Sequence, residues 1–334
     1  MLIITTIGIL ISLLCSPSTV FSTRLLDRLY LPSSLTGPET LAFDSIGGGP
    51  YTGVSDGRIM KFDESDPCRC FVEFAHITPD RNKTMCDGIS DFSSLQETCG
   101  RPLGLSFNYN TGDLYIVDAY FGLLKVPYDG GAATQLVADN EGDPFGFLTA
   151  VDVDPQTGIV YFTEASSTFK IRDIYELLNS TDRSGKLFSY DPKTEETSLL
   201  LDDIAVAAGV AVSNNGSFVL VSEYMENRVL RFWLTGPKAN SVDLFLELPG
   251  KPDNIKRNSR NEFWVAVNYA FGQPPPPMPP VLPMGLRVNE EGTVLQAVPL
   301  VQAFGTESVS DVQESDGKLY AASLRLSYAN VLTV

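Results

Sequence analysis

A short pattern of hydrophobic and polar residues recurs along this chain. Each copy has a turn rich in Gly, Asn or Asp, then a run of aliphatic and aromatic residues, then another polar turn. Short apolar runs bounded by turn residues are typical of β-strands. The copies begin at Gly49, Gly112, Gly158, Gly216, Asn261 and Gly317. Their spacing of roughly 45 to 65 residues is close to that of propeller repeats.

Several copies are followed by a second strand-like run at hairpin distance, as at residues 57–62, 185–190 and 227–233. This density suits four short strands per repeat, so the pattern predicts an all-β fold, a six-bladed β-propeller. Propellers usually close by pairing the N-terminal strand into the last blade, and we assign that strand to residues 25–32. Because the chain ends at Val334, soon after the sixth copy, we expect a short closing blade.

Two segments depart from the strand pattern. Residues 173–179 place Ile174, Leu177 and Leu178 on one helical face, which predicts a short helix inserted on the propeller rim. Residues 273–280 are mostly proline, which predicts a stiff polyproline loop between strands. A proline-binding partner for that loop is the alternative interpretation.

The first 22 residues have the pattern of a targeting segment. They contain no charged side chain, an apolar run from Leu2 to about Cys15, and a small-residue cleavage pattern that ends at Ser22. We therefore predict a signal peptide at 1–22 and one propeller domain at 23–334. No later segment has the apolar length of a membrane span, so we expect none after cleavage. The missing basic residue before the apolar run leaves an uncleaved anchor as the alternative.

In the secretory pathway, sequons can be glycosylated and cysteines can form disulfides. Asn82, Asn179 and Asn215 each begin an Asn-x-Ser/Thr sequence, which predicts N-glycosylation on accessible loops. Cys86 and Cys99 bracket a Gly/Ser/Asp-rich loop, and closing it with a disulfide would stabilise the fold by roughly 3 kcal/mol. We expect the protein in the vacuole or outside the cell, two locations that the sequence does not separate.

Cys68 and Cys70 form a Cys-x-Cys pair, whose thiols would point to one face of a strand. We favour an 86–99 disulfide beside a separate pair, with the reduced and oxidised states of that pair both open. A zinc site would need more ligands, and the single histidine of the chain is His76. We interpret His76 as a surface or half-buried residue without a catalytic role.

The formal net charge of −17 disfavours partners that are themselves anionic, such as nucleic acid and acidic membrane surfaces. It is compatible with cationic amine ligands, and also with simple solubility in an acidic or calcium-rich lumen. We expect a monomer that holds a small-molecule ligand in its central channel.

Several segments of the chain match those of one plant protein family in order and spacing. They are residues 99–101, 114–118, 131–136, 157–163, 217–221 and 253–258. The chain resembles strictosidine synthases and strictosidine synthase-like proteins over nearly its whole mature length, and the family disulfide matches Cys86 and Cys99. The resemblance implies a vacuolar enzyme of alkaloid biosynthesis, a carbon–nitrogen lyase that condenses tryptamine with secologanin.

The residues that carry this reaction in the family are replaced here. The catalytic glutamate position holds Ser310 and the neighbouring histidine position holds Ser308. The tyrosine that stacks on the indole falls at Thr149, although a partner aromatic is kept as Tyr224. A serine hydroxyl cannot serve as a general base near neutral pH. We therefore expect a ligand pocket at these four positions without strictosidine synthase activity.

The carboxylates near Ser310 in sequence are not expected to replace the glutamate of the family. Glu307 and Asp311 stand at odd offsets from Ser310, so in a regular strand their side chains point away from it.

A more distant resemblance is to calcium-dependent six-bladed hydrolases of the paraoxonase and gluconolactonase type. Glu39, Asp253 and Asn254 match the pattern of their metal ligands, and such oxygen ligands suit Ca²⁺. Asparagine ligands are missing at position 149 or 150 and at Ala208. The alternatives are thus a weak Ca²⁺-dependent hydrolase of esters or lactones, a residual condensing enzyme, and a non-catalytic ligand-binding propeller.

Overall fold

The computed structural model of the protein describes residues 23–271 and 280–334. The predicted signal peptide and its cleavage site lie outside the described residues, as does the proline-rich segment except for Pro280. No helix within the described ranges has the length and apolar character needed to span a membrane.

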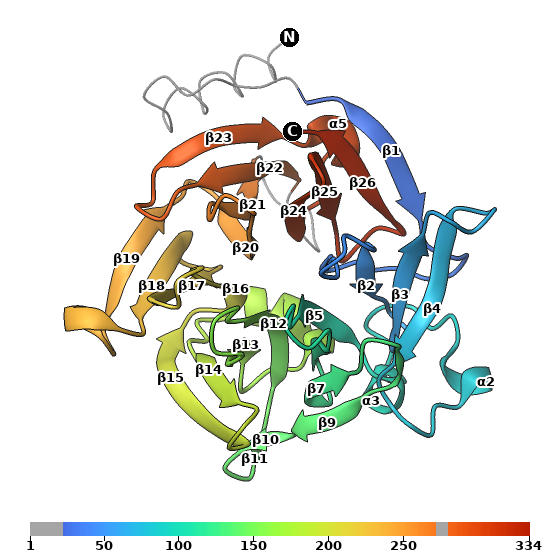
Figure 1. The fold of residues 1–334 in the computed structure, drawn as a ribbon, viewed down its shortest axis with the longest axis horizontal. Coiled ribbons are helices and arrows are strands. Elements are labelled where there is room, and N and C mark those ends of the chain that lie inside the picture. The colour runs from blue at the N-terminus through green and yellow to red at the C-terminus, as the bar shows by residue number, and fades with distance from the viewer. Residues whose placement is uncertain (1–22, 272–279) are drawn as a thin grey trace.

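Six four-stranded sheets are arranged around a central axis, each forming one blade of a β-propeller (Figure 1). The first three blades, each given from its inner to its outer strand, are as follows. Blade 1 has β2 (Tyr51–Gly53), β3 (Arg58–Asp63), β4 (Cys70–His76) and β8 (Gly131–Ala132); blade 2 has β5 (Pro102–Phe107), β6 (Leu114–Asp118), β7 (Gly122–Val126) and β9 (Thr134–Val137); blade 3 has β12 (Phe147–Val153), β13 (Val160–Ser166), β14 (Gly185–Asp191) and β15 (Glu196–Ile204).

The remaining three blades follow in chain order around the ring. Blade 4 has β16 (Ala207–Val212), β17 (Phe218–Glu223), β18 (Arg228–Trp233) and β19 (Val242–Glu247); blade 5 has β20 (Lys251–Arg257), β21 (Phe263–Ala270), β22 (Val281–Val288) and β23 (Val294–Pro299); blade 6 has β24 (Asp311–Ser315), β25 (Lys318–Ala322), β26 (Tyr328–Thr333) and β1 (Leu25–Tyr30). A two-stranded ribbon joins blades 2 and 3, made of β10 (Asp139–Asn140) and β11 (Asp143–Pro144).

The ring closes where the N-terminal strand joins the last blade. β1 pairs antiparallel with β26, with Tyr30 opposite Tyr328. This confirms the closing strand predicted at residues 25–32. The expected short closing blade is wrong, because β1 supplies the fourth strand that blade 6 would otherwise lack.

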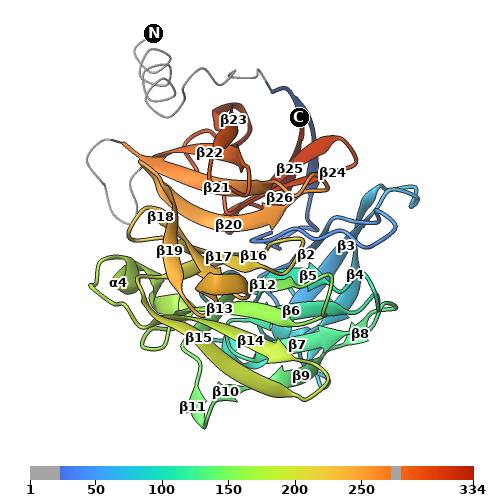
Figure 2. The same cartoon turned by 60° about the vertical axis from the view of Figure 1, so that its left-hand side comes forward.

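Short helices lie between the strands. They are α2 (Lys83–Cys86), α3 (Gln96–Cys99), the 3₁₀ turn η1 (Ile171–Asp173), α4 (Ile174–Leu178), the 3₁₀ turn η2 (Gly236–Lys238) and α5 (Val301–Phe304). The predicted helix at 173–179 is present as α4, which lies outside the sheets on one face of the ring (Figure 2). Its apolar face also lines a cavity at one mouth of the channel.

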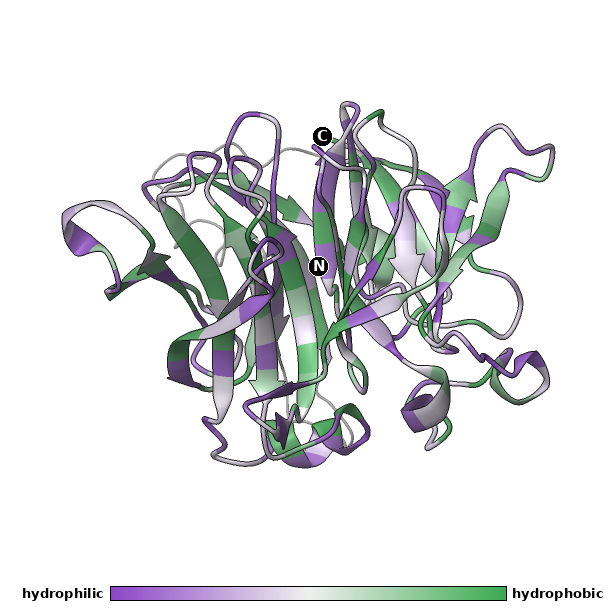
Figure 3. Ribbon diagram, turned by 60° about the horizontal axis from the view of Figure 1, so that its bottom comes forward, coloured by the Kyte–Doolittle hydropathy of each residue, from purple (hydrophilic) through white to green (hydrophobic). Residues whose placement is uncertain are grey.

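The core is distributed between neighbouring blades rather than gathered at one centre. Figure 3 shows that hydrophobic residues concentrate on the strands, while hydrophilic residues are common in the connecting loops. One buried cluster, for example, joins Val117 and Leu123 of blade 2 to Phe162 and Phe188 of blade 3. Burying apolar side chains between sheets stabilises the fold by roughly 25 cal/mol per Å².

The inner segments of the six blades share one register, which stacks their residues in layers around the channel. We define the upper layer as Glu39, Leu103, Thr149, Ala208, Asp253 and Ser310, the middle layer as Thr40, Gly104, Ala150, Gly209, Asn254 and Asp311, and the lower layer as Ala42, Ser106, Asp152, Ala211, Lys256 and Gln313. The middle layer needs small residues where inner strands approach closely. A Cβ atom on Gly209 would lie 2.5 Å from the Asp253 carbonyl oxygen.

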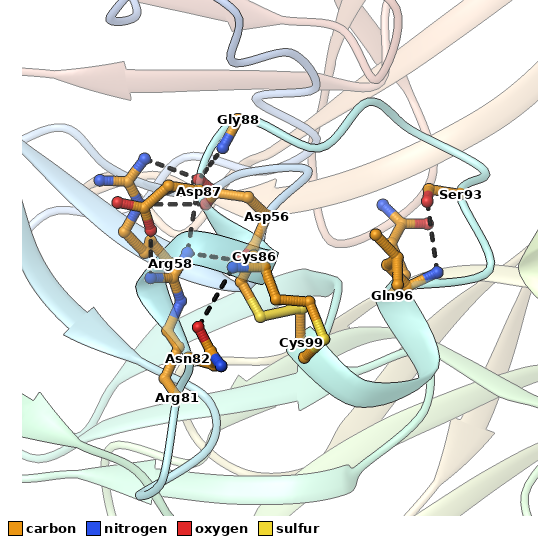
Figure 4. Close-up of a disulfide and its surroundings, with 12 residues drawn as sticks. Asp56, Arg58, Arg81, Asn82, Cys86, Asp87, Gly88, Ser93, Gln96 and Cys99 are labelled. Carbon is orange, nitrogen blue, oxygen red and sulfur yellow. Dashed lines mark hydrogen bonds and ion pairs between the residues drawn. A yellow bond between two sulfur atoms is a disulfide. The ribbon is translucent and has the colours of Figure 1, made fainter.

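Two disulfides are present among the described residues. Cys86 and Cys99 join α2 to α3, with Cα atoms 5.6 Å apart, and both side chains are buried. The bond lies beside ion pairs of Arg81 with Asp56 and Asp87 (Figure 4). This confirms the predicted 86–99 disulfide.

The second pair, which the sequence left open, is also bonded. Cys68 and Cys70 form a disulfide across a single intervening residue. Only Cys70 belongs to a strand, because the chain turns at Arg69, whose φ is +45°. The expectation that both thiols share one strand face is therefore wrong.

Replacing Cys86 and Cys99 together by alanine is expected to lower the free energy of unfolding by about 3 kcal/mol, since the bond restricts the unfolded chain over a longer loop. Urea unfolding of the non-reduced protein measures this loss. The matched control is the Cys68→Ala/Cys70→Ala variant, whose bond closes a much shorter loop and whose loss we expect to be smaller. Equal losses in the two variants would contradict the prediction.

Candidate functional site

The propeller channel holds a cavity of about 90 Å³ at one mouth, which we call the upper chamber. All six residues of the upper layer line it. The other lining residues come from β12 and β13 and from the loops and helices above the strands: Phe147, Ala165, Ile171, Ile174, Leu178, Val206, Tyr224, Ser308, Leu324 and Arg325. The chamber is therefore mainly apolar. Its polar side chains are Glu39, Thr149, Asp253 and Ser310 of the upper layer and Tyr224, Ser308 and Arg325 of the loops.

The structure brings together most of the residues predicted from the sequence. The four positions predicted to form a ligand pocket, Thr149, Tyr224, Ser308 and Ser310, all line the upper chamber. Of the three predicted metal ligands, Glu39 and Asp253 line the chamber as well.

Asn254 lies one layer lower and is buried. Its side-chain Nδ2 donates a hydrogen bond to the backbone oxygen of Glu39 at 3.4 Å, and its backbone N–H donates to the oxygen of Ser310. Asn254 therefore joins three blades below the chamber. It does not line the chamber with the two carboxylates.

Glu39 lies on the segment that enters blade 1, next to Ser310 of blade 6 in the same layer. Burial raises the pKa of Glu39 to about 7, against the lowering effects of a hydrogen bond with the Ser310 side chain and of the Arg101 charge. Its Oε2 atom is buried and has no hydrogen-bond partner among the described residues. A carboxyl group with such a pKa can gain or lose a proton near neutral pH.

Asp253 faces the same chamber from blade 5. Burial raises its pKa well above the ordinary value, and the charges of Glu39 and Asp311 raise it further. Two carboxylates that share a desolvated site cannot both ionise without repulsion. The Glu39–Asp253 pair therefore titrates as one unit and favours a cation beside it.

Arg101 holds the segment that carries Glu39. The guanidinium is fully buried, with Nε 2.6 Å from Oδ1 of Asp91, Nη1 donating to the Pro102 oxygen at 2.9 Å and Nη2 donating to the Gly37 oxygen at 3.0 Å. Gly37 has φ +75°, and a Cβ there would meet Nη2 of Arg101 at 2.0 Å. Glycine is thus required where the chain turns over the guanidinium.

The two carboxylates close to Ser310 in sequence have other surroundings. Glu307 is exposed, and Asp311 points to blade 1, where its Oδ2 accepts hydrogen bonds from the backbone of Leu41 and the hydroxyl of Thr40. The carboxyl group that Ser310 does contact is Glu39, which comes from the neighbouring blade.

Several chamber residues were missed by sequence reasoning. Phe147 and Arg325 line the chamber and belong to no motif that distinguishes them from ordinary structural residues. Arg101 ends the family segment 99–101, but nothing in that segment indicates its contact with Gly37. The apolar face of η1 and α4 also lines the chamber through Ile171 and Ile174, so the predicted rim insertion contributes to its wall. The sequence contained a usable signal only for the upper layer. Aligning the six inner-strand segments with one another would have placed these six residues at one shared position.

The remaining predicted residues lie away from the channel. His76 ends β4, with Nδ1 3.5 Å from Oε1 of Glu73, and is partly buried. Asn82, Asn179 and Asn215 are all exposed.

One group of three potential metal-binding side chains was found among the described residues, with ligand atoms all within 4.8 Å of one another. It consists of Asp66, Cys68 and Cys70. Glu39, Asp253 and Asp311 do not form such a group, although their charges influence one another.

Comparison with known proteins identifies the family of the chain. Residues 149–237 match the family model described as strictosidine synthase, and residues 24–62 match that of the strictosidine synthase-like N-terminal region. The chain is 42% identical to Protein STRICTOSIDINE SYNTHASE-LIKE 11 of Arabidopsis thaliana over 97% of its own length and 96% of the relative. It is 38% identical to the strictosidine synthase of Catharanthus roseus over 92% and 86% of the two chains.

Among solved structures, the fold is similar to a gluconolactonase of Xanthomonas campestris, with a TM-score of 0.61, 13% identity and coverage of 95% of this chain and 97% of the other. It is also similar to a calcium-binding protein, regucalcin, from Agrobacterium tumefaciens, with a TM-score of 0.60, 14% identity and 95% coverage of both chains. At such identities the similarity concerns the propeller fold alone.

Proposed function

The chain belongs to the strictosidine synthase-like family, and we propose that it keeps the channel pocket as a site for a small organic amine but not the synthesis of strictosidine. The observation that carries the proposal is the pair of carboxyl groups, Glu39 and Asp253, in a mainly apolar chamber. An ammonium group between them would relieve their repulsion, and the apolar walls would bury the organic body of the ligand.

The same pair suits proton exchange with the bound amine. The pKa of Glu39 of about 7 allows it to hold or release a proton at neutral pH, which the hydroxyl of Ser310 cannot do. Proton transfer to or from an amine is therefore the chemistry that this site supports best. Because both pKa values are raised, the Glu39–Asp253 pair would exchange the proton as one unit and hold the positive charge of the ligand between its two carboxyl groups.

We place the protein in the secretory pathway, in the vacuole or outside the cell. Two disulfides support an oxidising compartment, and exposed side chains at Asn82, Asn179 and Asn215 are suitable for N-glycans. The predicted signal peptide at 1–22 would direct the chain there. We propose a glycosylated monomer with one small-molecule ligand in its upper chamber.

Isothermal titration calorimetry with isoamylamine tests this proposal, because that amine joins one ammonium to a small branched apolar body. The neutral control is isoamyl alcohol, which has a similar shape. We expect the alcohol to bind about 10 to 100 times more weakly at pH 8, which corresponds to the loss of a charged hydrogen bond. Equal affinities for the amine and the alcohol would exclude a cation site in the upper chamber.

No strictosidine is expected from this protein with tryptamine and secologanin. The family glutamate and histidine positions hold Ser310 and Ser308, and the chamber of about 90 Å³ is smaller than the roughly 300 Å³ or more of usual ligand pockets. Product analysis by mass spectrometry measures the outcome, with the Catharanthus roseus enzyme as the positive control. Turnover comparable to the control would show that another residue has taken over the role of the family glutamate.

A second candidate function, a weak Ca²⁺-dependent hydrolase of esters or lactones, is favoured by the orphaned Oε2 atom of Glu39. A buried carboxylate oxygen without a partner is a suitable metal ligand. Glu39 and Asp253 would hold the ion and Ca²⁺ would polarise the substrate carbonyl group. Against this candidate, Ca²⁺ prefers six to eight oxygen ligands, and Asn254 points away from the chamber to a backbone oxygen.

For this candidate we expect Ca²⁺ binding that is weak, in the millimolar range, and lost in the Asp253→Ala variant. Calorimetry with CaCl₂ measures it, with MgCl₂ as a control for nonspecific screening. Ester and lactone turnover should then depend on Ca²⁺ and stop on chelation. Absence of Ca²⁺ heat, together with a more stable Glu39→Gln variant, would remove the hydrolase candidate and leave the amine proposal in place.

A further inference from the structure

The opposite mouth of the channel holds a second and larger cavity of about 400 Å³, which we call the lower chamber. Its inner end is formed by four polar residues of the lower layer, Ser106, Asp152, Lys256 and Gln313. No residue of the lower chamber also lines the upper one. The volume is within the usual range of small-molecule sites, roughly 300 to 1,000 Å³.

Lys256 crosses the channel between the two chambers. It starts from β20 in blade 5, and its ammonium donates a hydrogen bond at 3.3 Å to the backbone oxygen of Leu105 in blade 2, on the opposite side of the ring. Its other polar neighbour is Oδ2 of Asp311, 4.0 Å away in the layer above. An ammonium has three donors, so Lys256 has donors left for a ligand in the lower chamber.

Three of the four acidic groups that line the lower chamber already have hydrogen-bond partners, and the fourth, Asp316, is exposed. Asp152 accepts hydrogen bonds from the Ser106 hydroxyl and from the backbone of Val153 and Val212. Asp44 is held in the same way by backbone N–H groups and by the hydroxyl of Tyr51.

On blade 6, Glu314 binds the guanidinium of Arg260, the indole N–H of Trp264 and the amide of Asn258. Within the lower layer, Lys256 is thus the charged residue with free bonding capacity.

Gln313 adds an acceptor beside this cation. It occupies the same layer as Lys256 in the adjacent blade, and its Oε1 atom is buried with no hydrogen-bond partner among the described residues. A buried amide oxygen without a donor is costly, so a ligand hydroxyl at this place would be stabilising. Phe43, Phe107 and Tyr109 contribute an aromatic wall to the same cavity.

We propose that the lower chamber is a binding site for a small hydroxylated carboxylic acid, distinct from the amine site. Its carboxylate binds the Lys256 ammonium, its hydroxyl donates to Oε1 of Gln313, and its ring or chain lies against the aromatic wall. The proposal does not depend on the function of the upper chamber, because the residues involved are different.

The test is calorimetry of the full-length protein with 4-hydroxybenzoate, with 4-hydroxybenzamide and benzoate as matched probes. The amide lacks the charge, and we expect it to bind about 10 to 100 times more weakly. Benzoate lacks the hydroxyl, and we expect it to bind a few times more weakly. With saturating isoamylamine in the upper chamber, the preference of the lower chamber for the acid over the amide should remain.

Two variants assign the contacts. Lys256→Gln should remove the preference for the acid over the amide, but it leaves Asp311 without its cation and can disturb the fold. Gln313→Leu removes only an unpartnered amide, so the protein should fold, and 4-hydroxybenzoate and benzoate should then bind equally. Absence of heat with millimolar 4-hydroxybenzoate, equal binding of acid and amide to the native protein, or an unchanged hydroxyl preference in Gln313→Leu would overturn the proposal.

Discussion

Replacing Arg101 by methionine is expected to lower the free energy of unfolding by about 3 to 5 kcal/mol. The guanidinium is fully buried and bonds to the Asp91 carboxylate and to the backbone oxygens of Gly37 and Pro102. Methionine keeps much of the apolar contact but leaves a largely buried carboxylate and two carbonyl groups without their donor. Such uncompensated groups are among the most destabilising results of a single substitution.

Urea unfolding at pH 7 measures this effect, and Arg172→Met is the matched control. Arg172 also forms an ion pair, with Glu97, but both side chains are more than two fifths exposed. Exposed ion pairs contribute at most about 1 kcal/mol. A similar loss in the two variants would show that Arg101 does not stabilise the entry to blade 1 in the way described.

Replacing Glu39 by glutamine is expected to weaken isoamylamine binding about 10- to 100-fold at pH 8, because an ionised acceptor is replaced by a neutral amide of the same shape. Calorimetry of the variant measures the loss. Glu307→Gln is the control, since Glu307 is exposed and belongs to the segment that precedes Ser310. A loss of equal size in both variants would mean that general charge, rather than the chamber, attracts the amine.

The affinity of the native protein for isoamylamine should also depend on pH, and the raised pKa of Glu39 fixes the direction of that dependence. The ammonium binds the ionised form of Glu39, and the pKa of Glu39 is raised to about 7 in the free protein. Below that pH a proton competes with the amine, so affinity should fall by up to about tenfold per pH unit. Above it, affinity should be nearly constant until the amine itself loses its proton. The Glu39→Gln variant should show a flatter profile below pH 7.

The fold could be predicted from the sequence because a propeller repeats itself. Gly112, Gly158 and Gly216 each mark the turn before a second blade strand, so the number of blades could be read from their spacing. The closing strand could also be predicted, since the repeat leaves one place for it. The length of the last blade could not, because its fourth strand comes from the opposite end of the chain.

The candidate site was predictable only where family positions or the inner-strand register marked its residues. Glu39, Asp253 and Ser310 stand at equivalent positions of three blades, and the chamber contains them all. Asn254 lies one layer below them, because one residue along a strand changes the layer and the direction of the side chain.

The roles of Arg101 and Lys256 were missed for another reason. Arg101 reaches the segment before blade 1, and Lys256 reaches the blade opposite its own. Contacts of this kind depend on how the ring closes, which local spacing does not encode.

The channel also couples the two chambers electrostatically. Asp311 lies between them, pairs with Lys256 at 4.0 Å, and raises the pKa of both Glu39 and Asp253. Burial raises the pKa of Asp311 itself, and Lys256 opposes that shift. The positive charge of Lys256 is thus the internal counterion of the channel.

The central claim is that the carboxyl groups of the upper chamber hold an ammonium ion. A carbon-13 NMR titration of the Glu39 carboxyl group, assigned by its absence in Glu39→Gln, tests this claim most directly. In the free protein the signal should titrate near pH 7, and isoamylamine should lower the apparent pKa by about one unit or more, while isoamyl alcohol should not. A Glu39 signal that titrates near the ordinary value of 4.5 and does not respond to the amine would contradict the account.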